Sequence, residues 1–447
     1  MKNSKSPDNQ PSYSRRRFLR ASRATVAALG AAPMLGRATG ALATIAPSGS
    51  ANAHPDYYDK LGVTKIVNAA GTYTVLTSAV MPPPVRAAVA QAALHPVHLE
   101  ELQQKAGAYV AEKLKAEGCC ISCGASSALT LATAASVMAA NNCKPLDIPS
   151  LIGTLQFPKN EVVVQKIHRY EYDVAMQICG IKIVDVVTLD DYKQALGPNT
   201  VMTNYFNAAD AIGISREDWI AVAHEKGVPC HLDAAADMPP ISNLWKYTGM
   251  GFDMVSFSGG KDIRGPQNAG LLLGKKKYTV LAQRNLCPAD SVGRGMKVAK
   301  EQIVGMVAAV DWLLMQTDEG MEKESRDRMA VIIGMVKDIP SVQTSIIVPE
   351  LANHVPHLMI NFDPSVIGVS ARELQIRLRT ATPCIELNPH SASTSPSQGV
   401  PAQPNALVVT TFLLNPGEEL IVGRQIRRVL KNPKSVGTYP SLSSDVS

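Results

Sequence analysis

The sequence predicts an α/β protein with a large, mostly parallel sheet domain and a small C-terminal α+β domain. Three observations carry this prediction. Short apolar runs typical of buried strands alternate with helical patterns between residues 118 and 273, as in parallel sheets covered by helices on both faces. Small and polar residues gather where these runs end, and ligands bind beyond the strand ends in such folds. In the last portion of the chain, after residue 340, strand patterns alternate with helical patterns, which is typical of a small α+β domain.

Length and charge set the first limits on function. The chain has 447 residues with 46% apolar content, enough for two domains. Its formal net charge is +6, but residues 1–53 alone hold eight lysines and arginines against one aspartate. The rest of the chain is therefore almost neutral, which argues against a nucleic-acid-binding surface.

Residues 1–53 have the plan of an export signal. Arg15-Arg16-Arg17 precedes a segment rich in alanine and glycine, and Ala51-Asn52-Ala53 offers a small-residue cleavage site. This stretch resembles a twin-arginine signal, which implies the twin-arginine export machinery as a partner and a periplasmic location. Because Arg37 interrupts the apolar segment, no stable membrane anchor is expected. A disordered basic tail is the alternative.

The mature chain divides into an N-terminal arm, a large domain and a small domain. We expect the arm over 54–99, the large domain over 100–300, and a bridging helix with the small domain over 301–433. Apolar residues at helical spacing predict a helix at 99–117, and Ser215 is the N-cap residue of another. Further elements of the large domain are expected at 162–165, 172–179, 181–187, 189–196, 201–204 and 216–225.

The small domain combines helical and strand patterns. Helices are expected at 301–316, 320–337, 371–380 and 416–430, and strands at 342–348, 357–360, 384–387 and 406–411. The polar insert at 391–404 is predicted to be a loop. Residues 434–447 are rich in serine and proline and are predicted to be a disordered tail.

A single lysine, Lys261, follows a buried strand pattern at 252–257 and the turn Ser258-Gly259-Gly260. A second apolar run begins at 269. The glycines let another group approach the backbone closely. A lysine amine held and partly desolvated at the edge of a sheet can form a Schiff base with a carbonyl cofactor. For this motif alone, a surface lysine in a glycine-rich hairpin is the alternative.

Two upstream features favour the cofactor interpretation. Asp233 ends a short apolar run 28 residues before Lys261. An acid on the pyridine nitrogen keeps the ring of pyridoxal phosphate protonated, so that the ring can act as an electron sink. Farther back, a strand at 118–122 leads through a turn at 123–127 into an alanine-rich helix at 128–141, whose N-terminus could seat a phosphate.

Three stretches, 233–240, 243–245 and 252–267, carry a family resemblance. They resemble the selenocysteine-synthase-like branch of the pyridoxal-phosphate enzymes with the aspartate aminotransferase fold. Within that branch the chain is most similar to the D-glucosaminate-6-phosphate ammonia-lyase group rather than to the tRNA-dependent selenium transferases. The resemblance covers 57–430 and implies fold type I, with a seven-stranded type of sheet in the large domain.

By this resemblance, Lys261 is the Schiff-base lysine, Asp233 the partner of the pyridinium nitrogen, and Ser258 the hydroxyl that reaches the phosphate. His168 matches the position that covers one face of the ring. The other expected cofactor contacts are Gly124, Ala125 and Ser126 in the turn before the alanine-rich helix, and Gln267 in the loop that in such dimers reaches the neighbouring subunit's cofactor.

The resemblance favours a lyase that removes the Cα proton of an amino acid or amino-sugar acid and eliminates a β-leaving group, with a 2-oxo product and ammonia. Lys261, once displaced by the substrate amine, is the natural base for that proton. An aldolase, a racemase or an aminotransferase stays open, as does a non-catalytic binding protein on the same fold. The implied partners are a small amino substrate and further copies of the chain, in a homodimer or a larger homo-oligomer.

A substrate carboxylate usually needs a bidentate arginine, and the candidates are Arg169, Arg264 and Arg294. A surface ion pair is the alternative for each. Relatives often place a carboxylate-facing arginine in the strand near 381–389, where this sequence has none. A phosphorylated sugar acid is therefore not expected, and a periplasmic location argues further against it and against charged tRNA.

The eight cysteines lie mostly within apolar runs, as small core residues do. Cys119, Cys120 and Cys123 have no second pair at zinc spacing, so no metal site is predicted there. Folding before export also argues against a disulfide framework.

Overall fold

The computed structural model describes residues 55–145, 157–207, 213–350, 352–395 and 400–433. The predicted export signal at 1–53 and the predicted tail at 434–447 lie outside the described residues, as does part of the insert at 391–404. The chain divides into one unit that ends at Lys60 and a second unit that holds the rest; helix α2 (Tyr57–Leu61) lies across that boundary.

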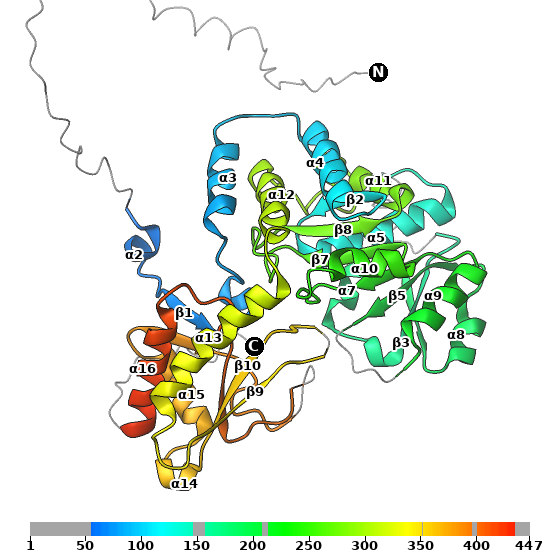
Figure 1. The fold of residues 1–447 in the computed structure, drawn as a ribbon. Helices are drawn as coiled ribbons and strands as arrows, with labels where there is room; N and C mark the ends of the chain where they lie inside the picture. The colour runs from blue at the N-terminus through cyan, green and yellow to red at the C-terminus, as the bar shows by residue number, and fades with distance from the viewer. Residues whose placement is uncertain (1–54, 146–156, 208–212, 351, 396–399, 434–447) are drawn as a thin grey trace, which may run out of the picture. The chain divides into compact units, whose positions relative to one another are not determined.

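A seven-stranded sheet forms the centre of the large domain, in the order β2-β8-β7-β6-β5-β3-β4 (Figure 1). Strand β8 runs antiparallel to both β2 and β7, and the other neighbouring pairs are parallel. The mostly parallel sheet predicted from the sequence is confirmed. Its strands are β2 (Gly118–Ser122), β3 (Glu161–Gln165), β4 (Lys182–Val186), β5 (Thr200–Phe206), β6 (Cys230–Asp233), β7 (Met254–Ser258) and β8 (Gly270–Gly274).

Successive side chains of these strands enter two different cores, because side chains alternate across a sheet. Leu271 and Leu273 pack in the core that also holds Trp219, and Leu272 packs in the core that holds Leu129. Helices that contribute to the first core include α4 (Leu99–Lys113), α9 (Arg216–Glu225), α10 (Asn243–Met250) and α12 (Lys300–Leu313). Helices of the second are α5 (Gly124–Asn141), α7 (Val174–Gln177) and α11 (Lys276–Asn285).

The helix predicted at 128–141 begins four residues earlier, at Gly124. Gly124 has a φ of +86°, so the chain turns there and enters the helix at once. The first turn of α5 therefore contains the residues that were expected to form a separate turn at 123–127. Helix α11 occupies a segment for which the sequence predicted no element. The many polar residues of this segment obscure the helical spacing of its apolar residues.

The small domain contains two further sheets. Strands β9 and β12 flank β10 in an antiparallel sheet, and β1 pairs in parallel with β11. Strand β1 comes from the predicted N-terminal arm, so the arm joins the C-terminal part of the chain. The elements are β1 (Ile66–Ala69), β9 (Gln343–Ile347), β10 (His357–Asn361), β11 (Cys384–Leu387), β12 (Ala406–Val409), α13 (Asp318–Val336), α14 (Pro364–Ile367), α15 (Ala371–Arg379) and α16 (Glu418–Lys431).

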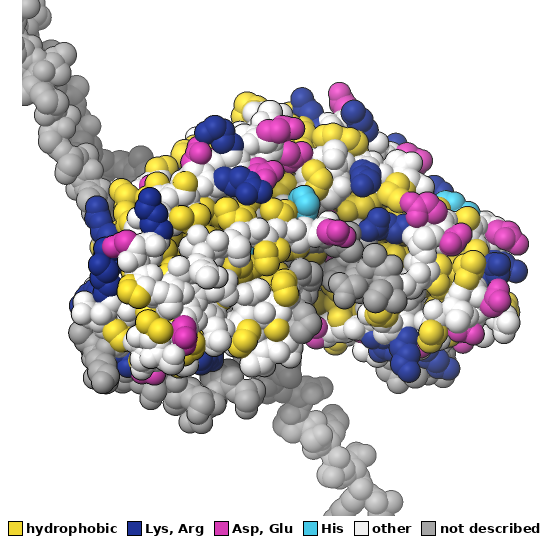
Figure 2. Space-filling view, turned by 60° about the horizontal axis from the view of Figure 1, so that its bottom comes forward, with side chains coloured by type: hydrophobic (Ala, Val, Ile, Leu, Met, Phe, Trp, Pro, Cys, Tyr) yellow, Lys and Arg dark blue, Asp and Glu magenta, His cyan; other side chains and the backbone are white. Residues whose placement is uncertain are grey.

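The remaining elements are η1 (Thr74–Leu76), α3 (Pro83–Ala93), η2 (Lys166–His168), η3 (Glu171–Asp173) and α8 (Leu189–Ala195). Val85 of α3 and Tyr192 of α8 also belong to the first core. Ser215 accepts a hydrogen bond from the backbone of Asp218, which confirms the predicted start of α9. Basic and acidic side chains are interspersed on the face shown in Figure 2. Among the described residues, no helix is both long and apolar enough to span a membrane.

A substitution at Gly274 tests how tightly the sheet is packed. It has a φ of +144°, and a Cβ there would lie 2.1 Å from the carbonyl oxygen of Asp253. We expect Gly274→Ala to lower the free energy of unfolding by about 3 kcal/mol, from backbone strain and overpacking together. Urea unfolding measures this change. Gly249→Ala is the control, because a Cβ at Gly249 would meet no atom within 4 Å. An equal decrease in the free energy of unfolding in both variants would contradict the prediction.

Candidate active site

Lys261 lies in a compact turn between β7 and β8, and its side chain is half-buried. Gly259 fixes the turn by donating a hydrogen bond to Ala269 O at 2.8 Å, and Gly265 N donates one to Gly259 O at 2.7 Å. A Cβ on Gly260 would lie 2.5 Å from the Cα of Gln267, so a glycine is required there. The turn therefore holds the lysine at a defined place beyond the end of β7.

Asp233 is the last residue of β6, and only 5% of its surface is exposed. Its carboxyl group accepts hydrogen bonds from the Tyr170 hydroxyl and, at 3.0 Å, from the Ala235 backbone. Burial raises the pKa of Asp233, while these hydrogen bonds and the Lys261 charge oppose the rise. The two residues predicted to act together thus lie within electrostatic reach of each other.

Tyr170 is a site residue that the sequence prediction missed. Its ring stacks on Phe206, with the centroids 4.2 Å apart, and its hydroxyl donates to Asp233. Burial and the neighbouring Asp233 charge raise the pKa of Tyr170. The phenol therefore stays protonated and fixes the orientation of the carboxyl group. The sequence offered one signal, since Tyr170 lies only two residues after His168.

His168 is buried at the start of the loop that carries Tyr170. Its Nδ1 faces the Phe206 backbone N–H and the Gln165 amide, each at 3.4 Å, and its ring packs edge-on against Tyr205. Burial lowers the pKa of His168 to about 4, and the nearby Arg216 charge adds to the shift. The imidazole is therefore neutral at pH 7, which suits the predicted contact with an aromatic ring.

The N-terminus of α5 and the end of β7 meet across β8. Gly270 pairs with Ser122 on one side and with Ser258 on the other. A Cβ on Gly270 would lie 2.6 Å from the Gly124 carbonyl carbon, so the two segments approach more closely than another residue would allow. The predicted phosphate contacts Ser258, Gly124, Ala125 and Ser126 are thereby gathered at one edge of the sheet.

These residues fit a phosphorylated pyridine cofactor. The N-terminus of α5 presents unpaired backbone N–H groups and a positive helix dipole, which favour an anion. In its first turn, Ser127 Oγ is buried and has no hydrogen-bond partner among the described residues. A phosphate here, a ring nitrogen at Asp233 and a carbonyl at Lys261 would satisfy the polar groups that the fold brings together.

The three candidate arginines are engaged elsewhere. Arg169 pairs with Asp173 and, at 2.7 Å, with Asp185. Arg264 donates to Val80 O at 2.9 and 3.1 Å and lies over the Trp312 ring. Arg294 contacts Cys287 Sγ at 3.2 Å and Asp290 at 3.5 Å. The contacts described for these side chains do not bring any of them to Lys261.

Gln267, the predicted contact to a neighbouring subunit, is exposed and donates a hydrogen bond to Thr74 O at 3.0 Å. Within one chain it therefore braces the turn against the N-terminal arm. Its predicted role in a dimer stays a prediction.

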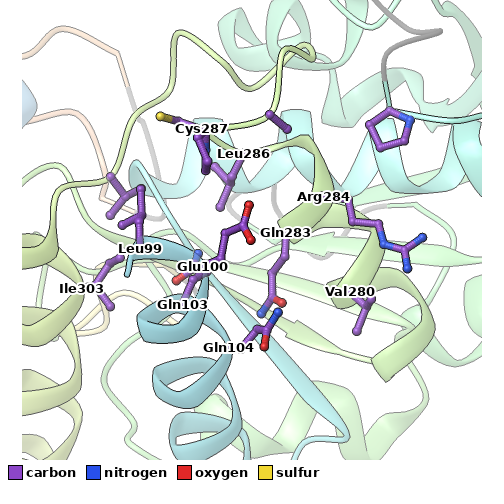
Figure 3. A pocket seen from close by; sticks show the side chains of 14 residues that line it. Leu99, Glu100, Gln103, Gln104, Val280, Gln283, Arg284, Leu286, Cys287 and Ile303 are labelled. Carbon is purple, nitrogen blue, oxygen red and sulfur yellow. The ribbon is translucent and has the colours of Figure 1, made fainter. Parts of the chain in front are cut away.

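Two other features lie away from Lys261. A cavity of about 380 Å³ lies between α4 and α11, and Figure 3 shows Gln103 and Gln283 beside it. These two amides donate to the backbone carbonyls of β2, and none of the predicted site residues lines the cavity. His224, Cys230 and Asp253 could hold a metal ion, but Lys275 already pairs with Asp253 at 2.6 Å.

The cysteines predicted to be core residues are free thiols in the described part of the chain. Cys119 and Cys120 are fully buried, and burial raises the pKa of Cys120 to about 12. Cys123 is half-buried at the N-cap of α5, and burial raises its pKa as well. The first two are therefore neutral thiols that pack in the sheet.

Comparison with known proteins shows what the chain is similar to. The aminotransferase class-V family matches residues 150–294. D-glucosaminate-6-phosphate ammonia lyase of Salmonella typhimurium is 25% identical over 337 residues, which cover 73% of this chain and 87% of that protein. A 5'-C-glycyluridine monooxygenase-decarboxylase of Streptomyces is 25% identical over 348 residues, which cover 75% of this chain and 84% of that protein.

More distant likenesses agree with these. L-seryl-tRNA(Sec) selenium transferase of Aquifex aeolicus is 25% identical over 234 residues, which cover 44% of this chain and 49% of the transferase. A solved structure of D-glucosaminate-6-phosphate ammonia-lyase superposes with a TM-score of 0.71 at 23% identity and covers 84% of this chain and 98% of its own. The predicted resemblance and fold are confirmed, and the relatives support a pyridoxal-phosphate-dependent enzyme of the class-V type.

Asp233→Asn tests the assignment of the ring partner. The variant removes a buried carboxylate, and a hydrogen bond to a charged group contributes about 1.5–3 kcal/mol, so the affinity for pyridoxal phosphate should fall roughly 10- to 100-fold. Titration of the cofactor-free protein with pyridoxal phosphate measures it. Asp190→Asn, on the exposed face of α8, is the control, and unchanged affinity in Asp233→Asn would refute the assignment.

Proposed function

We propose that the chain is a pyridoxal-phosphate-dependent lyase that removes the Cα proton and a β-leaving group from an amino acid or an amino-sugar acid, in the manner of an ammonia-lyase or dehydratase. The observation that carries this proposal is the placement of Lys261 and Asp233 at the ends of adjacent parallel strands. In this proposal Lys261 is the amine, Asp233 is the acid, and the N-terminus of α5 is the binding place for the anion.

The chain's own residues would act as follows. When bound, pyridoxal phosphate supplies an electron sink for the negative charge that develops at Cα. Asp233 would hold the ring nitrogen protonated, with its carboxyl group oriented by Tyr170. The N–H groups at the start of α5, with Ser258, would bind the phosphate. The freed Lys261 amine would take the proton from Cα, as a base within reach of the substrate.

The substrate proposed here is unphosphorylated. Residues 381–389 contain no arginine. In addition, the candidate arginines Arg169, Arg264 and Arg294 already contact carboxylates, a carbonyl, a thiol or an aromatic ring. These contacts already occupy the three candidate partners for a second anionic group of the substrate.

A second candidate reaction comes from the relative that is described as a monooxygenase-decarboxylase. Its likeness to this chain equals that of the ammonia lyase, at 25% identity over a similar length. The same site residues would then support loss of the carboxylate with uptake of oxygen. The two reactions differ in their co-substrate and in their products.

We propose further that the enzyme is exported through the twin-arginine machinery and works in the periplasm as a homodimer or larger homo-oligomer. The export proposal rests on Arg15-Arg16-Arg17 and Ala51-Asn52-Ala53, outside the described residues. The oligomer proposal rests on the exposed Gln267 in the turn that follows Lys261.

Product analysis separates the reactions. The protein loaded with pyridoxal phosphate is incubated with a panel of amino acids and unphosphorylated amino-sugar acids. We expect equal amounts of a 2-oxo acid and ammonia, with no oxygen uptake, and no products from Lys261→Ala, because the variant lacks the base. Oxygen consumption with release of carbon dioxide would instead support the decarboxylase, and antipode or aldehyde formation would contradict both.

The N-terminus of the native protein tests export. Mass spectrometry of protein from the periplasmic fraction should show a chain that begins at His54 or a few residues beyond. Replacing Arg15, Arg16 and Arg17 with lysine should keep the protein in the cytoplasm, because the twin-arginine route requires the guanidinium pair. A native protein that retains Met1 would contradict the proposal.

A further inference from the structure

A second, small cavity adjoins the turn that carries Lys261. Segments far apart in the sequence build it: the loop after β1, the start of β10, and the residues that follow β11 and β12. Asp262, the residue directly after Lys261, also lines it. Its lining residues are Ala70, Gly71, Thr72, Tyr73, Asp262, Pro349, Asn353, Val355, His357, Asn388, His390, Val400, Thr410, Phe412 and Leu413.

The walls of this cavity carry neutral hydrogen-bonding groups. Asn388 donates to Ala70 O at 2.8 Å and to Thr410 Oγ1 at 3.2 Å, and His357 Nδ1 meets the same Thr410 hydroxyl at 2.9 Å. Burial lowers the pKa of His357 to about 4 and also lowers the pKa of His390. Both imidazoles are therefore neutral at pH 7, and the described lining contains no lysine or arginine.

Asp262 is the acidic residue of this lining, and 4% of its surface is exposed. Burial raises the pKa of Asp262 to about 7, against the opposing charges of Lys261 and Arg264 and a hydrogen bond from its own backbone. The other titratable groups that line the cavity are Tyr73, His357 and His390. Burial also raises the pKa of Tyr73. Asp262 is therefore the one group of this lining that can both hold and release a proton near pH 7.

The size of the cavity limits what can enter it. About 20 Å³ is open to the centres of water molecules, and one water requires roughly 10–15 Å³ by this measure. A hydroxyl group or a water molecule fits this space. The cavity thus suits a small neutral group held beside Asp262.

We propose that Asp262 is the acid that protonates the leaving group, and that this leaving group is the β-hydroxyl of a small amino acid whose remaining side chain is uncharged. The inference rests on the proposed β-elimination and names its substrate class. Asp262 and Lys261 are neighbours in one turn and have different roles. The lysine takes the proton from Cα, and the aspartic acid donates a proton to the oxygen on Cβ.

The proton balance of this step closes. The Cα–H bond breaks and its proton moves to the Lys261 amine, while the Cβ–O bond breaks and its electron pair leaves with the oxygen. The proton of Asp262 joins that oxygen, and water departs into the small cavity. One water later hydrolyses the carbon–nitrogen bond, so that serine, for example, gives pyruvate and ammonia. Neither an oxidant nor a reductant is consumed.

Two leaving groups test the role of Asp262. A hydroxyl must be protonated as it departs, but chloride leaves without a proton. Asp262→Asn should lower kcat/KM for serine roughly 100-fold or more, while kcat/KM for β-chloroalanine stays within about threefold. The exposed control Asp190→Asn should leave both values unchanged. Equal losses for both substrates would reduce Asp262 to a structural role, and no loss for either would show that it is not the acid.

A measurement without cofactor or substrate probes the same group. An acid whose pKa is higher in the folded protein than in the unfolded protein lowers the stability of the fold as the pH rises from the unfolded-state pKa to the folded-state pKa. The Tm of cofactor-free Asp262→Asn minus that of the wild type should therefore increase between about pH 4 and pH 7 and then level off. A difference that does not change with pH would overturn the proposal.

The outcomes distinguish this inference from the proposed function. If the wild type forms no oxo acid from either substrate while the Tm difference rises as expected, the lyase assignment fails and Asp262 remains a buried proton carrier. If the wild type turns over β-chloroalanine but not serine in either enantiomer, the hydroxyl assignment is wrong and the lyase assignment stands.

Discussion

The parallel pairing of β6 and β7 is the constraint on which the rest of the site depends. Because parallel strands end at the same edge of a sheet, the residues that follow them must meet there. Asp233 closes β6, and Lys261 follows β7 by three residues. The antiparallel β8 then returns beside β7 and brings Gly270 against the start of α5. One arrangement of strands thereby gathers the acid, the amine and the anion seat.

Burial gives these groups different protonation states in a small volume. It keeps His168 and His357 neutral and raises the pKa values of Asp233 and Asp262. The two aspartates differ in their partners: Asp233 accepts hydrogen bonds from Tyr170 and Ala235, whereas Asp262 faces the small cavity. Pairs of acids whose surroundings separate their pKa values are typical of sites that move protons.

The sequence predicted the large sheet and the elements of the small domain, because these depend on local patterns, and the same patterns pointed to Lys261 and Asp233 as candidate site residues. Buried strands show as short apolar runs, and Lys261 and Asp233 directly follow two of them. Tyr170 and Asp262 were missed because their roles depend on contacts across the fold. Tyr170 contacts Asp233, and Asp262 shares a cavity with residues that lie far from it in the sequence. The engagement of Arg169, Arg264 and Arg294 by other groups is likewise a property of packing, which spacing along the chain does not reveal.

The measurement that tests the central claim most directly is the absorption spectrum of the purified protein with pyridoxal phosphate, before and after borohydride, beside Lys261→Ala. We expect a visible band that borohydride removes, with the cofactor then fixed to Lys261, and no such fixation in the variant. A protein that shows no band after pyridoxal phosphate is added would contradict the account, and the fold would then serve a non-catalytic binding protein.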